Sequence, residues 1–101
     1  MYEFIESSVF ARYVHDYLTE DGYADMQWYL ANHPDAGDLM PGSGGCRKLR
    51  WGIPDKGKRG GVRVIYYGQT SEGLIWLLAI YAKTQRENLP AHVIRLMKDK
   101  W

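Results

Sequence analysis

Apolar residues recur along this chain at two spacings, and the spacing separates the expected helices from the expected strands. In the first third and near the C-terminal end they recur every three or four residues, as on one face of a helix. In between they alternate with polar residues or run continuously, as they do in strands. The pattern predicts the order β-α-α-β-β-β-α, an α+β fold in a single domain spanning residues 1–101.

The N-terminal third is expected to hold a short strand followed by two helices. Tyr2–Ile5 is a short apolar segment that predicts the strand. Ser7 or Ser8 can cap the first helix, Thr19 with its two following acids can start the second, and Pro34 ends it. The stripes expected to be buried are Val9, Phe10, Tyr13, Val14, Tyr17 and Leu18 on the first helix and Tyr23, Met26, Gln27 and Leu30 on the second.

Two strands with alternating polar side chains are expected in the middle of the chain. Alternation in Cys46–Gly52 places Lys48 and Arg50 on one face, and alternation in Val62–Tyr67 places Arg63 away from its apolar neighbours. The segment between these strands is rich in Gly and Pro, so a hairpin loop is expected there.

The C-terminal third is expected to hold an interior strand and a last helix. Leu74–Lys83 is almost continuously apolar, which is typical of a strand covered on both faces, and Gln69–Gly73 is expected to form the turn before it. Asn88 can cap the last helix, with Pro90 tolerated in its first turn. The expected buried stripe of that helix is Val93, Leu96 and Met97.

These elements predict one small, mostly antiparallel sheet. The helix pair is expected on one face, and the last helix at one end or edge. Residues 35–45 are expected to form a turn-rich connection into the basic strand. The sheet face away from the helix pair would then carry Lys48, Arg50 and Arg63.

Positive charge is concentrated in one stretch. Between Arg47 and Arg63 the sequence has seven basic residues and one acid, a local charge of +6, whereas the whole chain is +1. A nearly neutral protein with such a cluster is suited to binding an anion, and the commonest large anion is a phosphate backbone. Arg47 alternates onto the apolar side of its strand, where a salt-bridged or snorkelling side chain is expected.

Other classes of site find little support in the composition. The single cysteine, Cys46, excludes an internal disulfide and fits a reducing cytoplasm, and it is interpreted as a small residue entering a strand. The histidines are scattered, so no metal or other cofactor is expected. The longest apolar run is too short to span a membrane, and no signal peptide is recognised, so the expected location is cytoplasmic.

Three strings of the sequence together carry a family resemblance: G-G-C-R-K-L-R-W, G-K-R-G-G-V-R-V-I-Y-Y and L-L-A-I-Y-A-K. With them, nearly the whole chain resembles the RelE/ParE superfamily of bacterial type II toxins, most closely its HigB-type RelE members. The resemblance implies a RelE-like fold and a ribosome-dependent endonuclease that cleaves mRNA in the ribosomal A site. It also implies three partners: a cognate antitoxin with a helix-turn-helix, the ribosome with its mRNA, and operator DNA bound together with the antitoxin.

The resemblance also implies site residues. Those matching catalytic positions are Lys48, Arg50, Arg63, Tyr81 and Lys83. Apart from the resemblance, the loop cations Lys56, Lys58 and Arg59 are expected to grip ribosomal RNA non-specifically rather than to take part in the chemistry. RNA cleavage without a metal needs a base, an acid and charge stabilisation at phosphorus. We expect Arg50 and Arg63 to hold the phosphate oxygens, Lys48 or Lys83 to act as acid or base, and Tyr81 to transfer a proton or stack on a base.

One departure from the family leaves the general base open. The best known member has a catalytic tyrosine in its C-terminal helical region, but residues 85–90 of this chain contain none. Tyr81, Tyr66 or Tyr67 could substitute, or the cations alone could support a slower reaction. Two other functions remain open at this point: a ParE-like inhibitor of DNA gyrase without nuclease activity, and a non-catalytic RNA-binding module.

Overall fold

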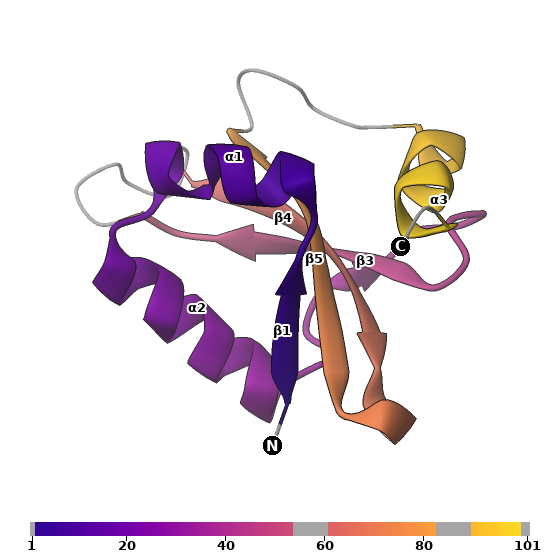
Figure 1. Ribbon diagram of the computed structural model, residues 1–101, viewed down its shortest axis with the longest axis horizontal. Coiled ribbons are helices and arrows are strands. Elements are labelled where there is room, and N and C mark those ends of the chain that lie inside the picture. The colour runs from indigo at the N-terminus through magenta and orange to yellow at the C-terminus, as the bar shows by residue number, and fades with distance from the viewer. Residues whose placement is uncertain (1, 54–60, 83–89, 100–101) are drawn as a thin grey trace.

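The chain folds around one twisted sheet with helices on both of its faces (Figure 1). The computed structural model describes residues 2–53, 61–82 and 90–99. Within these ranges the strands are β1 (Glu3–Glu6), β2 (Asp38–Leu39), β3 (Cys46–Trp51), β4 (Val62–Gln69) and β5 (Leu74–Ala82). The helices are α1 (Ser8–Tyr17), α2 (Glu20–Asn32) and α3 (Ala91–Asp99), with a short 3-10 turn at Thr70–Glu72.

The strand order across the sheet is β1-β5-β4-β3-β2. β1 pairs with β5 in parallel, and every other neighbouring pair is antiparallel, which confirms the prediction of a mostly antiparallel sheet. β2 was not expected, because a two-residue strand is too short to show any periodicity. It pairs Asp38 with Lys48 and Leu39 with Arg47, within the segment interpreted as a turn-rich connection.

Both expected helix caps form. The Ser7 hydroxyl oxygen accepts a hydrogen bond from the backbone N–H of Phe10 at 2.8 Å, and the Thr19 hydroxyl oxygen accepts one from the N–H of Gly22 at 3.0 Å. α2 ends at Asn32, before Pro34. The proposed cap of the last helix, Asn88, lies outside the described residues.

The sheet separates two buried clusters. α1 and α2 cover one face, where their apolar side chains meet those of β3, β4 and β5; the fully buried members include Phe10, Val14, Met26, Leu30, Val62, Val64, Tyr66 and Leu77. α3 covers part of the other face through Ile94, which packs with Cys46, Ile65 and Leu78. The last helix was expected at one end or edge of the sheet. Instead, its apolar side is buried against the second face.

The buried stripes of two helices are narrower than their sequences predict. On α1, Phe10 and Val14 are fully buried, but Val9 and Tyr13 are about 40% exposed. Each precedes a buried residue by one position, which turns it about 100° around the helix axis toward solvent. On α3 the expected Leu96 is exposed and Ile94 takes its place in the core.

A β-bulge shifts the register between β4 and β5. Ile65 pairs with Ala79 and Tyr66 pairs with Leu77, so Leu78 has no partner on β4. The Ser7 hydroxyl donates a hydrogen bond to the Leu78 carbonyl oxygen at 2.7 Å and so satisfies this irregular position. Leu77 belongs to the core under α1 and α2, whereas Leu78 and Ala79 belong to the core under α3.

Candidate functional site

Three side chains from three adjacent strands lie in one row across the sheet. Arg50 on β3 is the register partner of Arg63 on β4, and Arg63 is the register partner of Tyr81 on β5. Directly paired residues on antiparallel strands project to the same face with Cβ atoms about 5 Å apart. Lys48 precedes Arg50 by two residues and shares that face. These four residues form the candidate site.

The candidate site lies on the sheet face opposite the helix pair. Leu49, Val62 and Val64 alternate with its basic residues and point into the core under α1 and α2. The prediction that Lys48, Arg50 and Arg63 share the face away from the helix pair is therefore confirmed. Lys83 and the loop residues Lys56, Lys58 and Arg59 lie outside the described residues.

Among the described residues, Arg50 and Arg63 lack the acidic partners expected of arginines with a purely structural role. Arg50 is exposed and Arg63 is half-buried, and in the part of the chain that the structure describes neither forms an ion pair with a carboxylate. Arg63 donates a long hydrogen bond, at 3.4 Å, to the carbonyl oxygen of the adjacent Val62. Like charges directly opposite each other on a sheet are destabilising, so this arrangement favours a bound anion between the two guanidinium groups.

The structure separates the three candidate tyrosines. Tyr66 points into the core on the opposite face, where its hydroxyl donates to the Pro34 carbonyl and accepts from the Gly37 N–H. Tyr67 shares the face of the candidate site but lies two same-face positions from Arg63, with Lys98 of α3 over its ring. Tyr81 is next to Arg63, and at 7% exposure its ring offers little surface for a base to stack on.

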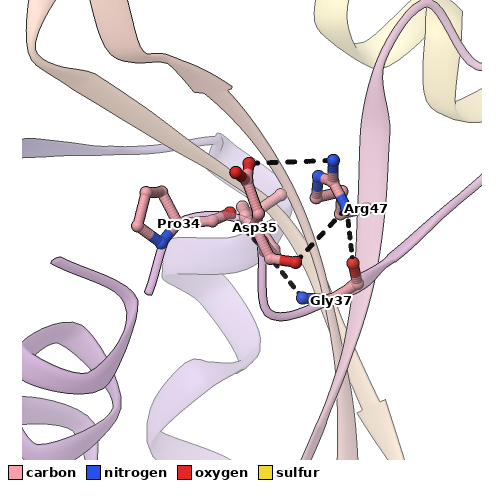
Figure 2. A network of polar contacts seen from close by, with 5 residues as sticks. Pro34, Asp35, Gly37 and Arg47 are labelled. Carbon is pink, nitrogen blue, oxygen red and sulfur yellow. Dashed lines mark hydrogen bonds and ion pairs between the residues drawn. The ribbon is translucent and has the colours of Figure 1, made fainter. Parts of the chain in front are cut away.

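Arg47 ties the segment before β2 to the sheet, on the face away from the candidate site (Figure 2). Its guanidinium donates to the carbonyl oxygens of Gly37 at 2.8 Å and Asp35 at 3.3 Å, and it lies 3.7 Å from the Asp35 carboxylate. Burial raises the pKa of Tyr66, so its hydroxyl remains a donor to Pro34 in the same segment. The expectation that Arg47 is salt-bridged is confirmed.

Cys46 is fully buried where β3 begins, as expected for a small strand residue. Burial raises the pKa of its thiol, which contacts the Ser43 carbonyl oxygen at 3.5 Å, so it is unsuited to act as a nucleophile. No group of three or more His, Cys, Asp or Glu side chains is placed to hold a metal ion within the described ranges.

An acid and an aromatic ring beside the candidate site escaped the sequence prediction. A depression of about 450 Å³ lies at the edge of β3, next to the C-terminal half of α2. Its lining residues are Tyr29, Ala36, Asp38, Lys48, Leu49 and Arg50, and we call it the edge groove. Asp38 lies opposite Lys48 because β2 pairs with β3, and no pattern in the sequence predicts that pairing.

Charge is segregated between the two parts of the sequence. Residues 1–38, which include α1 and α2, carry eight acids and one arginine, a net charge of −7. Residues 39–101 carry twelve basic residues and four acids, a net charge of +8. The second part of the sequence therefore attracts a polyanion, while the first part repels it.

Comparison with known proteins supports this architecture. No family model matches the chain. Among solved structures, it is similar to the free state of an E. coli toxin RelE variant with two arginines replaced by alanine, with a TM-score of 0.58 over 96% of each chain. The chain has a RelE-like fold. At 12% sequence identity this likeness concerns the fold, and membership of the HigB-type subgroup stays a prediction.

The RelE-like fold accounts for the element order found here, including the leading strand and helix pair and the closing helix. Among the residues that the structure describes, no helix is long and apolar enough to cross a bilayer.

Proposed function

We propose that this chain is the toxin of a type II toxin-antitoxin system and acts as a metal-independent endonuclease on mRNA in the ribosomal A site. The RelE-like fold supports the toxin class. The observation that carries the nuclease activity is the row formed by Arg50, Arg63 and Tyr81, with Lys48 beside it. Together these four residues would present two guanidinium groups, an ammonium group and a phenol to one phosphate.

In the proposed reaction the 2′-oxygen of a ribose forms a bond to the adjacent phosphorus while the bond from phosphorus to the 5′-oxygen breaks. The products are a 2′,3′-cyclic phosphate and a 5′-hydroxyl. The 2′-hydroxyl loses its proton and the 5′-oxygen gains one, so the site needs a base and an acid. The requirement for the 2′-hydroxyl restricts the reaction to RNA.

Arg50 and Arg63 are the proposed anion clamp. Their guanidinium groups flank one position on the sheet, where they would hold the non-bridging oxygens as negative charge grows at phosphorus. Tyr81 next to Arg63 is the proposed proton-transfer group, and Lys48 or Lys83 the partner acid or base. The loop cations Lys56, Lys58 and Arg59 are proposed to grip ribosomal RNA non-specifically rather than to take part in the chemistry.

The test of the nuclease is Arg63→Ala, with Arg50→Ala as a second variant. Each is induced in bacteria, and mRNA cleavage is mapped by primer extension alongside growth. Loss of one transition-state donor is expected to slow cleavage about a hundredfold or more and to relieve growth arrest. Arg12→Ala removes an exposed arginine of α1, away from the candidate site, and is expected to retain both effects.

Three outcomes would contradict the proposal. Growth arrest that persists in a folded Arg63→Ala protein would remove Arg63 from the reaction. If the wild-type protein left mRNA intact but caused an SOS response with DNA breaks, it would be a gyrase poison. RNA binding without cleavage would indicate a non-catalytic module.

The proposed partners follow from the toxin class. A cognate antitoxin with a helix-turn-helix would neutralise the toxin and, as the complex, bind operator DNA. Co-expression of Arg63→Ala with the product of the neighbouring reading frame tests this, because the variant can accumulate without arresting growth. Co-purification of the two chains is expected, and an operator fragment should bind the complex but not the toxin alone.

A further inference from the structure

The edge groove combines three chemical features: an aromatic ring, a carboxylate and two cations. Tyr29 contributes an aromatic ring, 38% exposed, and packs against His33 and Trp51 with ring centroids 4.9 Å and 5.5 Å away. Asp38 contributes an exposed carboxylate. Lys48 and Arg50 are shared with the candidate site, so the groove is continuous with the proposed position of the scissile phosphate.

These features match the parts of one nucleotide. Bases of single-stranded RNA are recognised by stacking on aromatic rings and by hydrogen bonds to their Watson–Crick edges. Cations beside such a ring bind the sugar-phosphate backbone. Asp38 lies one strand beyond Lys48, which places its Cα about 12 Å from that of Arg63 by strand geometry, too far for it to act at the phosphate that Arg63 would hold.

We propose that the edge groove binds a guanine base next to the cleaved bond and that Asp38 selects it. This inference rests on the proposed function and adds a specificity-determining residue to it. Guanine presents two neighbouring donors on its Watson–Crick edge, N1–H and N2–H, and a carboxylate accepts both at once. Adenine and cytosine each place an acceptor beside their amino group, and uracil has a single donor between two acceptors. Tyr29 provides the stacking surface.

The segment that carries Asp38 is held firmly against the sheet. The Gly37 N–H donates to the Tyr66 hydroxyl, and Arg47 donates to the Gly37 carbonyl oxygen (Figure 2). A Cβ atom at Gly37 would lie 3.0 Å from the backbone of Lys48, so the chain passes β3 as closely as a glycine allows. A carboxylate on so constrained a support can discriminate between bases.

The first experiment maps cleavage sites on a transcript library in a translation extract, for the wild-type protein and for Asp38→Ala and Asp38→Asn. The wild-type protein is expected to cut preferentially where guanine occupies one fixed position relative to the cleaved bond. Both variants are expected to lose about tenfold of that preference while still cutting RNA. Asp16→Asn removes an exposed carboxylate of α1, away from the groove, and should keep the preference.

The second experiment changes the base instead of the protein. Inosine lacks the N2 amino group, so replacing the selected guanine by inosine should slow wild-type cleavage but leave Asp38→Ala unaffected. 7-Deazaguanine keeps the Watson–Crick edge and should be cut like guanine. A wild-type enzyme with no base preference, or an unchanged preference in folded Asp38→Ala, would overturn the inference while leaving the nuclease standing.

If no RNA is cut at all, the proposed function fails and the groove is tested by binding alone. Guanosine monophosphate, added to the wild-type protein, should shift the NMR signals of Tyr29 and His33 at lower concentration than the other three ribonucleoside monophosphates. Equal affinity for all four, or no shift in these residues, would overturn the assignment of the groove.

Discussion

Arg50 and Arg63 face each other directly across β3 and β4, on a sheet face where the described residues provide no carboxylate partner for either. Two like charges directly opposite each other on neighbouring strands are destabilising. The pair therefore lowers the stability of the free protein, whereas a bound phosphate would make the same two charges favourable. The pair is therefore better explained by anion binding than by a contribution to folding stability.

The first prediction concerns this pair. Arg50→Gln, which keeps the side-chain stem but removes the charge, is expected to raise the free energy of unfolding by about 0.5 kcal/mol at low salt while lowering nuclease activity. The gain should shrink as salt screens the repulsion. Urea unfolding at two salt concentrations measures it.

The control for Arg50→Gln is Arg12→Gln, in which the arginine lies over the ring of Tyr13 at 5.5 Å on α1. This control should not gain stability, since an exposed cation–π contact contributes about 0.5 kcal/mol. A destabilised Arg50→Gln protein would mean that Arg50 makes favourable contacts in the free protein, which contradicts the interpretation of the pair as repulsive.

The second prediction compares two helix caps. Ser7 is buried and serves both as the cap of α1 and as the donor to the carbonyl of Leu78 at the bulge. Ser7→Ala therefore removes a cap and leaves a buried carbonyl without its donor, and should cost about 2–3 kcal/mol of unfolding free energy. Thr19→Ala removes only an exposed cap of α2 and should cost about 1 kcal/mol. Equal losses in thermal or urea unfolding would refute a structural role for the bond to Leu78.

The third prediction is a loss of stability at alkaline pH. Burial raises the pKa of Cys46 above its ordinary 9.0 and that of Tyr66 above 10.0; burial, followed by the hydrogen bond to Glu6, raises that of Tyr23. Each group is neutral when protonated, so the folded state keeps its proton to a higher pH than the unfolded state does. The free energy of unfolding should therefore be insensitive to these groups below about pH 8 and fall once the unfolded chain ionises.

Urea unfolding between about pH 7 and pH 10.5 follows this loss. Cys46→Ala should delay its onset from the thiol range to the tyrosine range, while lowering stability by a constant amount at neutral pH. If the variant and the wild-type protein lose stability with the same pH dependence, the Cys46 thiol does not contribute.

Most of the fold, and the face on which the basic residues of the candidate site lie, could be predicted because their signals are periodic. Alternation placed Lys48, Arg50 and Arg63 on one face, and capping residues placed the starts of α1 and α2. Pairing between elements leaves no such signal. The two-residue strand that brings Asp38 to Lys48, and the face that α3 covers, depend on contacts between distant segments.

The bulge at Leu78 divides β5 into two halves of opposite parity. In an unbroken strand Leu77 and Tyr81 would share a face, but here the first packs under the helix pair and the second stands beside Arg63. Because of this one inserted residue, β5 supplies Leu77 to the core under the helix pair and Tyr81 to the candidate site on the opposite face. Deleting Leu78 would place Ala79 directly after Leu77, so that the remaining residues alternate regularly on their present faces while the core under α3 loses one leucine.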